Sequence, residues 1–399
     1  MIVACPDCGA VQRLPELTGG GKSECWRCQS VLERATGRSL DAALACSLAT
    51  LLLLFPANLM PFLKVTLLGV ARESWLASGP LYMWHERWVL MAAIVAAEAV
   101  LLPFARFGLL TTALGALRLG RHAGWVGPAF RWAERLDEWA MPDVFLFGAI
   151  IGYTRVVHRL PVTIEPGGWC LIVVALLAML TRASLDRRAV WRRIAAPGAA
   201  PKSPTVGCVE CDLVLPARYA GAHCPRCGAR VWRRRPFAVM RSAALVIAGY
   251  LLYPVANILP MSVDYQLGSP RPHTIFGGVQ QLVEAGLFPL AAIIFTTSIA
   301  IPLAKLVGMT WLFLSVENRS SHALVRKTRA FRFIDAIGRW SNVDIFTIAV
   351  FLPLMQFAPL VTVASGGGAS PFLLVAVLTM LASRLFDPRL LWDAAEPPR

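Results

Sequence analysis

Long apolar runs recur along the whole chain and restrict its fold more than any other sequence feature. A helix needs about 20 apolar residues to cross the roughly 30 Å hydrocarbon core of a bilayer. Eight runs approach or exceed that length, which predicts an all-α polytopic membrane protein. They cover residues 40–62, 88–117, 139–158, 168–185, 237–260, 286–315, 341–361 and 370–386. The chain is 56% hydrophobic and 16% charged, a composition that excludes an ordinary soluble enzyme.

Positive charge is concentrated in alternate segments between these runs. Of the 39 Lys and Arg residues, 31 fall in segments 1–41, 117–138, 182–241, 316–340 and 384–399. Cytoplasmic loops carry such an excess, so both termini and the central segment are expected on the cytoplasmic side, with an even number of spans. The formal net charge of +15 is then a topology signal, and no nucleic-acid partner is expected.

The sequence repeats itself with an offset of about 200 residues. The motif ANLMP at 57–61 recurs 199 residues later as ANILP at 256–260, and Trp139-x-x-x-Asp143 recurs 201 residues later as Trp340-x-x-x-Asp344. Each half has four spans, so both halves should share one orientation, related by an axis along the membrane normal. The predicted units are a zinc ribbon (1–38), a four-helix transmembrane module (39–194), a linker (195–204), a second ribbon (205–235), a second four-helix module (236–392) and a tail (393–399).

Eight of the ten cysteines form four Cys-x-x-Cys pairs, two ahead of each membrane module. Cytoplasmic thiols stay reduced, so the pairs predict metal sites and not disulfides. Four thiolates complete a tetrahedral ligand set, which indicates a closed, structural zinc site in each small β ribbon, ahead of rubredoxin-type iron. The predicted ligands are Cys5, Cys8, Cys25, Cys28, Cys208, Cys211, Cys224 and Cys227.

Ionisable residues inside the spans are candidates for function, because a bilayer makes them costly. Lys305 is the clearest, and Ser298 and Pro302 lie near the same helix face. Pro302 cannot donate a hydrogen bond to the carbonyl of Ser298, so a kink is expected there. Two interpretations of Lys305 stay open: a functional polar cavity, or a side chain that reaches the cytoplasmic interface.

Other polar residues in the spans differ between the halves. Asp143 and Asp344 begin the third and seventh spans, where a carboxylate suits the positive end of a helix. Asp344 could instead pair with Lys305. Glu98 and Arg106 lie on roughly one face of the second span, whereas the position equivalent to Glu98 in the second half is Thr297. The main polar site is therefore expected in one half only.

Two motifs mark the non-cytoplasmic ends of the first and fifth spans: Asn58 with Pro61, and Asn257 with Pro260. A capping turn at the helix end is the favoured interpretation, and a polar rim at the outer mouth is the alternative. The sequence shows no Gly-rich phosphate loop, no HExxH motif and no Ser/His/Asp arrangement, so no enzyme is expected.

Together, these motifs resemble the paraquat-inducible protein A family of bacterial inner-membrane proteins. The resemblance covers nearly the whole chain and rests on the two tetracysteine ribbons, the two Asn-x-x-Pro motifs, Pro302-x-x-Lys305 and Trp139-x-x-x-Asp143. It implies an inner-membrane component of intermembrane lipid transport, which loads or unloads lipids at a periplasmic MCE-domain tunnel protein and maintains the envelope barrier. The polar site implied for a lipid headgroup or a coupling proton comprises Lys305, Ser298, Thr296, Thr297, Asp344 and Thr347.

Three other classes of function stay open. One is a scaffold or regulator of the MCE partner without transport of its own. Another is a channel, exporter or transporter for small amphiphiles or ions. The third is a zinc-sensing regulator, against which the closed four-thiolate sites argue.

Overall fold

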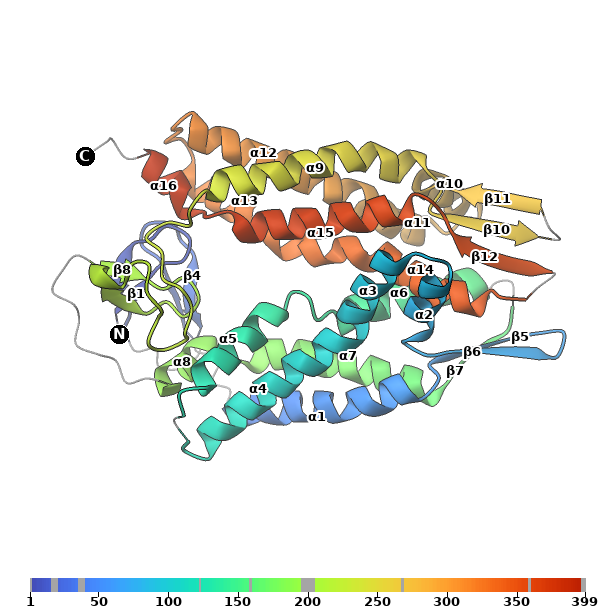
Figure 1. Ribbon diagram of the computed structural model, residues 1–399, viewed down its shortest axis with the longest axis horizontal. Coiled ribbons are helices and arrows are strands. Elements are labelled where there is room, and N and C mark those ends of the chain that lie inside the picture. The colour runs from blue at the N-terminus through green and yellow to red at the C-terminus, as the bar shows by residue number, and fades with distance from the viewer. Residues whose placement is uncertain are drawn as a thin grey trace.

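The computed structural model describes residues 2–15, 21–34, 40–121, 123–157, 160–194, 205–266, 269–357 and 360–395. The predicted linker, 195–204, lies outside the described residues. Two helical modules lie side by side, with the small β ribbons at one end and two β-sheets at the other (Figure 1). The expected all-α membrane fold with small β modules ahead of each half is thereby confirmed.

The helices of the second half follow those of the first in the same order. The first half contains α1 (Leu40–Leu59), β5 (Leu63–Leu67), β6 (Val70–Ser74), α2 (Ser78–His85), α3 (Val89–Ala96), η1 (Ala97–Leu101), α4 (Leu102–Arg118), α5 (Val126–Leu136), α6 (Pro142–Val157), β7 (Val162–Ile164), α7 (Pro166–Ser184) and α8 (Arg187–Ile194). The second half contains α9 (Ala238–Ile258), β10 (Ser262–Gln266), β11 (Ser269–His273), α10 (Ile275–Glu284), α11 (Phe288–Phe295), η3 (Thr296–Ala300), α12 (Ile301–Glu317), α13 (Leu324–Ile337), η4 (Gly338–Asn342), α14 (Val343–Leu354), β12 (Val361–Ser365), α15 (Ala369–Leu385) and α16 (Arg389–Ala395).

Five described helices are long and apolar enough to cross a membrane, or six if α15 and α16, bent by 53°, form one span. The five are α1, the continuous helix Val89–Arg118, α7, α9 and the continuous helix Phe288–Glu317. The runs 139–158 and 341–361, predicted as spans, contain shorter helices: α6 has 16 residues and α14 has 12. These two helices pack against each other, so protein replaces lipid around much of their surface.

The two 30-residue helices, Val89–Arg118 and Phe288–Glu317, each contain a π-helical turn at an equivalent position: η1 in the first half and η3 in the second. Each turn lies directly before a helix that has a proline in its first turn, Pro103 in α4 and Pro302 in α12. Proline lacks a backbone N–H, so the regular ladder is broken there and the turn widens. The expected irregularity at Pro302 therefore takes the form of a π turn that contains Ser298.

Three-stranded antiparallel sheets close the end opposite the ribbons. Their strand orders are β6-β5-β7 and β11-β10-β12. Because β5 follows α1 and β7 follows α6, the pairing of Leu63 with Ile164 brings the ends of these two helices together. In the second half, Ser262 pairs with Ser365 and brings together the ends of α9 and α14 in the same way. Helices α6 and α14 therefore run from the ribbon end to the sheet end (Figure 1).

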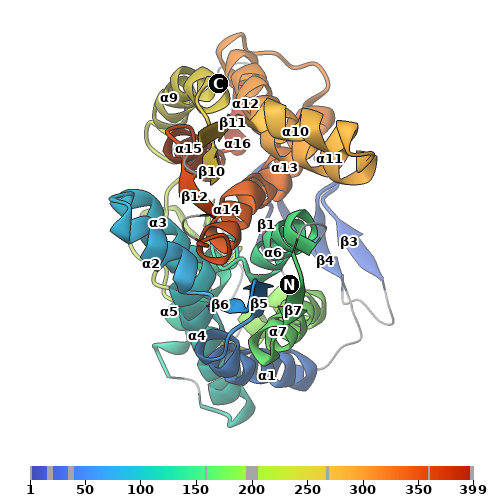
Figure 2. The same ribbon diagram turned by 90° about the vertical axis from the view of Figure 1, so that its right-hand side faces the viewer.

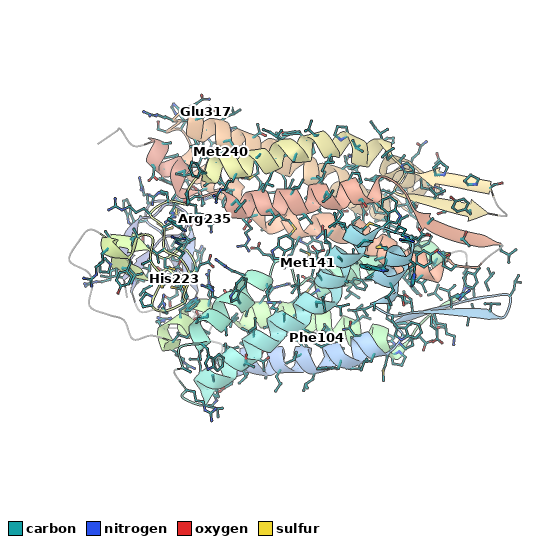
Figure 3. All side chains as sticks on the ribbon, in the orientation of Figure 1. Phe104, Met141, His223, Arg235, Met240 and Glu317 are labelled. Carbon is teal, nitrogen blue, oxygen red and sulfur yellow. The ribbon has the colours of Figure 1, made fainter. Side chains whose placement is uncertain are left out.

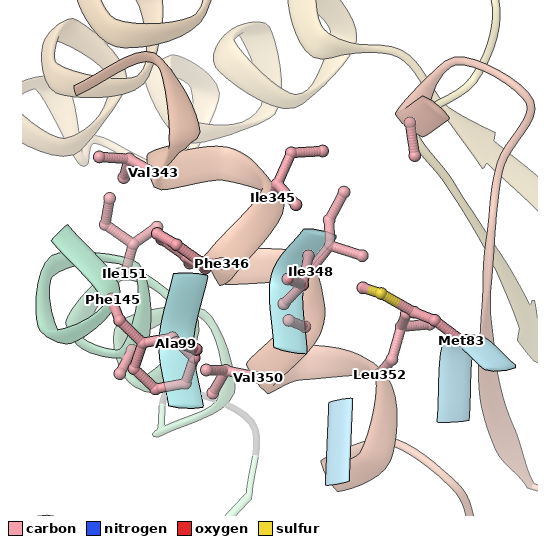
Figure 4. Close-up of a cluster of buried hydrophobic side chains, with 14 of the residues drawn as sticks. Met83, Ala99, Phe145, Ile151, Val343, Ile345, Phe346, Ile348, Val350 and Leu352 are labelled. Carbon is pink, nitrogen blue, oxygen red and sulfur yellow. The ribbon is translucent and has the colours of Figure 1, made fainter. Parts of the chain in front are cut away.

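The two halves meet along α6 and α14, which lie in the middle of the molecule when it is viewed from the sheet end (Figure 2). Ten of the 12 residues of α14 are buried. Phe346 stacks on Phe145 with ring centroids 5.4 Å apart, and a Cβ added at Gly148 would lie 2.8 Å from the Cβ of Phe346. Figure 4 shows this apolar cluster, to which Met83 of α2 also contributes.

Each ribbon packs against the membrane module of the other half. The first ribbon contains β1 (Ile2–Ala4), β2 (Val11–Arg13), β3 (Lys22–Glu24) and β4 (Val31–Arg34). Its Val3, Leu14 and Leu32 share a hydrophobic cluster with α12, α13 and α16 of the second half. Arg27 also stacks on Trp392 of α16, with its guanidinium carbon 4.8 Å from the ring centroid.

The second ribbon contains β8 (Thr205–Gly207), β9 (Val214–Pro216) and η2 (Ala217–Tyr219). It packs on α4, α5 and α8 of the first half. Asp212 accepts a hydrogen bond of 3.1 Å from Arg188, and Glu210 accepts one of 2.8 Å from Arg135. The ribbons also touch each other through an isolated bridge between Val3 and Leu213. This crossed docking ties the two halves together at the ribbon end.

Candidate functional site

The eight predicted metal ligands gather into two buried groups of four thiols. In the first ribbon, the sulfur atoms of Cys5 and Cys28 lie 3.5 Å apart, and those of Cys8 and Cys25 lie 3.6 Å apart. In the second ribbon, the corresponding distances are 3.6 Å for Cys208 and Cys227 and 3.7 Å for Cys211 and Cys224. Within each group all four sulfur atoms lie within 4.8 Å of one another.

The same backbone turn presents the sulfur atoms in all four Cys-x-x-Cys pairs. The residue after the second cysteine has a positive φ: Gly9 (76°), Gln29 (59°), Asp212 (57°) and Gly228 (68°). Its N–H donates to the carbonyl of the first cysteine, at 2.9 Å for Gly9, Gln29 and Asp212 and 2.8 Å for Gly228. Gln29 adopts a conformation that L-residues with a Cβ rarely occupy, which indicates that the turn itself is required.

A tetrahedral metal ion fits both groups of thiols. Metal–sulfur bonds of about 2.3 Å in a tetrahedron place the sulfur atoms about 3.8 Å apart, close to the distances seen here. Four ligands fill the coordination sphere and leave no open position for a substrate. Both ribbons can therefore hold a metal ion as a structural element.

In the second module, the π turn η3 brings part of the predicted polar site together. The Ser298 hydroxyl donates a hydrogen bond to Asp344 of α14. The Thr297 hydroxyl lies 3.4 Å from that of Ser298, and Thr347 lies one turn after Asp344, where its hydroxyl donates to the carbonyl of Val343. Thr296 is exposed on the other side of the helix and is not part of this group.

Lys305 lies two turns further along the same helix and is fully buried, with 0% of its surface exposed. Its Nζ has no hydrogen-bond partner among the described residues. The carboxylate that acts on it electrostatically is Asp335 of α13, and not Asp344 as the sequence suggested. Asp335 is itself held by a 2.8 Å hydrogen bond from Ser383. Burial raises the pKa of Asp335, while Ser383 and Lys305 oppose that shift.

In the first module, the equivalent region is a closed set of ion pairs. Arg106 lies 2.5 Å from Asp137, and Arg182 lies 2.7 Å from both Asp137 and Asp143. Arg339 of the second half approaches Asp143 at 3.8 Å. Although burial alone would raise it, the guanidinium groups of Arg106 and Arg182 hold the pKa of Asp137 below its usual value. Asp143 was predicted as a charge at the start of a helix. That role is incomplete, because Asp143 also pairs with arginines.

One buried hydrogen bond joins the polar residues of the two halves. The side-chain amide of Asn342 donates to Glu98 at 3.1 Å, and Glu98 is only 1% exposed. The same amide lies 3.7 Å from the sulfur of Met141, which is seen between the halves in Figure 3. Glu98 thus takes part in the contact between modules and does not pair with Arg106.

The two asparagines at the sheet end have the geometry of helix caps. The amides of Asn58 and Asn257 donate to the carbonyls of Leu54 and Tyr253, each at 2.8 Å. The carbonyl of Pro61 accepts from Gly167 at 3.0 Å, and that of Pro260 accepts from Gly368 at 2.9 Å. These bonds tie α1 to α7 and α9 to α15, as a capping turn does.

Sequence reasoning missed several residues near these sites: Asp137, Arg182, Asp335, Gly338, Arg339, Asn342 and Ser383. The repeat contains a signal that could have found four of them. At the offset of 201, Asp137 corresponds to Gly338 and Arg182 corresponds to Ser383. A charged pair in one half that becomes Gly and Ser in the other marks a position where the two copies have diverged.

Comparison with known proteins identifies the family. The family model described as Paraquat-inducible protein A matches residues 40–195 and 239–396, one match in each half. The chain belongs to the paraquat-inducible protein A family. It is 30% identical to the intermembrane transport protein PqiA of Escherichia coli (strain K12), over 98% of this chain and 95% of that protein.

Other members of the family match over a similar length. The chain is 28% identical to the lipophilic envelope-spanning tunnel protein A of Escherichia coli (strain K12), over 98% of this chain and 91% of that protein. It is 26% identical to a probable intermembrane transport protein of Haemophilus influenzae, over 98% of this chain and 95% of that protein. No solved structure matches the chain. Family membership and the apolar helices fit a multi-pass inner-membrane transport protein.

Proposed function

We propose that the chain is the inner-membrane component of an intermembrane lipid transport system. It loads or unloads lipids at a periplasmic MCE-domain tunnel protein and so maintains the envelope barrier. Relatives that align over nearly the full chain are named for intermembrane transport and for an envelope-spanning tunnel, which supports this role. The observation that carries the proposal is the fully buried Lys305, whose Nζ has no hydrogen-bond partner among the described residues. Such a group in a membrane span is costly unless it is used.

The ribbons and both termini are cytoplasmic in this proposal, and the two sheets are periplasmic. The support is the excess of Lys and Arg, of which 31 of 39 lie in the segments at the ribbon end. The sheet end then faces the tunnel partner. The backbone edge of β6 ends one sheet and offers it unpaired strand groups, whereas in β11, at the edge of the other, Pro270 and Pro272 have no N–H to donate.

The polar site of the second module works with a coupling proton or with a lipid headgroup. A small cavity of about 50 Å³ touches Asp344 and Thr347 on one side and His273 and Thr274 of the sheet end on the other. A cavity of that size admits water-sized species and not a phospholipid headgroup. In this conformation the geometry therefore favours proton or ion passage to Asp344, and lipid handling needs the module to open.

Both ribbons hold zinc in this proposal, as structural ions. Purified protein should contain two zinc ions per chain, one for each four-thiol group, when its metals are measured by mass spectrometry. Replacing Cys8 with Ser should remove one ion and leave the other. One iron per group, with the absorption of a rubredoxin centre, would contradict the assignment of zinc and leave the transport proposal intact.

The transport proposal is tested by Lys305→Ala in cells that lack the native protein. We expect loss of the envelope barrier to detergents and bile salts, because the only described lysine buried in the second module's span is removed. Thr296→Ala, an exposed residue of the same helix, is the matched control and should restore the barrier. Full activity of Lys305→Ala at normal expression would favour the scaffold. Capture of the MCE partner should be unchanged in both variants, since neither residue lies at the sheet end.

A further inference from the structure

The largest cavity among those described lies at the ribbon end, away from Lys305. Its volume is about 790 Å³, and it opens between α5 of the first module, the second ribbon and the adjoining ends of α9 and α15. Arg235, which lines it, lies between Met240 of α9 and His223 of the second ribbon in Figure 3. Three parts of the chain thus form its walls, and we refer to it as the arginine cleft.

Positive charge dominates the arginine cleft. Five arginines line it, namely Arg135, Arg230, Arg235, Arg241 and Arg384, against one carboxylate, Glu210. Glu210 is already held by Arg135 through two hydrogen bonds of 2.8 Å and 3.2 Å, and Arg384 pairs with Glu138. Among the described residues, no ion pair joins Arg230, Arg235 or Arg241 to a carboxylate. Three guanidinium charges therefore remain for an anion.

The start of α9 adds to the positive electrostatic potential of the arginine cleft. Helix α9 has 21 residues, and its first turn, with Ala238 and Arg241, forms part of the cleft wall. No side chain caps its N-terminus, because the N-cap position is Phe237. The free N–H groups and the positive end of the helix dipole attract phosphate at such a position.

The remaining walls are apolar and aromatic. Trp132, Trp139 and Trp232 line the cleft together with Leu381 and Leu385 of α15. The last two are exposed, at 36% and 37% of their surface, and so offer contact to an acyl chain. Tryptophan is enriched where hydrocarbon meets water, and arginine there contacts lipid phosphates.

The depth of the cleft selects a lipid over a soluble anion. Ala238 begins one membrane span and Leu385 ends the apolar helix α15, so the cleft lies where the apolar helices leave the bilayer. We propose that the arginine cleft binds the phosphate headgroup of an anionic phospholipid from the leaflet that faces the ribbons. The bound lipid bridges both halves and the second ribbon. This site goes beyond the proposed transport function and requires only that the protein sits in a membrane.

The test measures lipid binding to the full-length protein with its metals in place. Nanodiscs of phosphatidylcholine alone are compared with nanodiscs that contain phosphatidylglycerol, and bound lipid is read by native mass spectrometry. The double variant R230Q/R241Q removes two unpaired charges that lie at the exposed wall. Each lost charge-assisted contact should weaken phosphatidylglycerol retention roughly ten-fold. R218Q, an exposed arginine of the second ribbon outside the cleft wall, is the matched control and should bind like the wild type.

Two further measurements decide between sources of phosphate. Inorganic phosphate and a short RNA are added as competitors, and neither should displace the lipid at low millimolar concentration. Equal retention of phosphatidylglycerol and phosphatidylcholine, unchanged retention in R230Q/R241Q, or displacement by either competitor would overturn the proposal. Circular dichroism and zinc content establish that the variant is folded. Failure here leaves the barrier assay of Lys305→Ala unaffected, so the two proposals fail separately.

Discussion

Arg106 and Lys305 occupy equivalent positions in the two membrane modules, yet their surroundings differ. Arg106 is neutralised by Asp137, which also pairs with Arg182. Around Lys305, the residues equivalent to Asp137 and Arg182 are Gly338 and Ser383. A Cβ added at Gly338 would lie 3.2 Å from the Nζ of Lys305, so the missing side chain is the one that would contact the cation.

This difference indicates that one fold serves two purposes. In the first module, charges that are costly in the membrane are compensated within a fixed network that also reaches Arg339 of the other half. In the second module the equivalents of Asp137 and Arg182 are Gly338 and Ser383. Asp344 of α14 contacts Ser298 of η3, whereas Lys305 lies two turns further along, on α12, and interacts with Asp335. We infer that the first module is a fixed scaffold and the second is the module that changes its protonation or its contacts.

The largest expected effect is on stability, in the first module. Asp137→Ala removes the carboxylate that Arg106 and Arg182 share; the buried Arg106 loses its ion pair, while Arg182 keeps Asp143. The free energy of unfolding should fall by about 3–5 kcal/mol, measured by thermal unfolding in detergent. The double variant R106M/D137L, which removes a pair of charges together, should recover much of that loss. A stability for Asp137→Ala equal to that of the wild type would contradict the idea of a fixed network.

The second prediction has the opposite sign. Lys305→Met keeps most of the side-chain volume and removes a buried amine that has no hydrogen-bond partner among the described residues. The free energy of unfolding should therefore be unchanged or higher by about 1–4 kcal/mol, while envelope-barrier activity is lost. The matched change Arg106→Met should destabilise the protein. If both variants lose stability equally, the two modules are not distinct in the way proposed.

The third prediction converts the second module into a copy of the first. Gly338→Asp places a carboxylate beside Lys305, and the backbone of Gly338 is helical (φ −53°), so a side chain is tolerated. Stability should rise by roughly 1 kcal/mol, from the new pair and from reduced freedom of the unfolded chain, while barrier activity falls. Gly338→Asn has nearly the same shape without the charge, and it should keep more activity. Full activity of Gly338→Asp would show that Lys305 need not be unpaired.

Much of this architecture could be predicted from local sequence. Hydropathy located the long spans, the repeat identified two copies of one module, and Cys-x-x-Cys spacing located both groups of four thiols. Each of these signals lies within a short stretch of chain. Helices α6 and α14 are shorter than the predicted runs, and they pack against each other, a contact that the local sequence pattern does not reveal.

The arrangement of the sites depended on long-range packing and was therefore missed. The ribbons dock on opposite modules through contacts such as Arg27 with Trp392, which are more than 300 residues apart. Lys305 was expected near Asp344, but seven residues of helix separate it from Ser298, the partner of Asp344. At about 1.5 Å per residue that is roughly 10 Å, too far for one ion pair.

The smallest expected effect is the pH dependence of stability, which should have opposite signs in the two modules. Burial raises the pKa of Asp335, so its contribution is greatest below the unfolded pKa of about 3.9 and declines as pH rises through the raised value. Burial would raise the pKa of Asp137, but the neighbouring arginines lower it below its usual value. The contribution of Asp137 to stability is therefore present above about pH 3.9 and is lost as pH falls through the lowered pKa. Relative to the wild type, the stability of Asp335→Asn should therefore increase as pH rises, and the stability of Asp137→Asn should decrease. Unfolding midpoints in detergent between about pH 2 and pH 7 measure both, and loss of zinc at low pH cancels because every variant retains both ribbons. Equal slopes for the two variants would place both carboxylates in the same kind of network and remove the distinction between the modules.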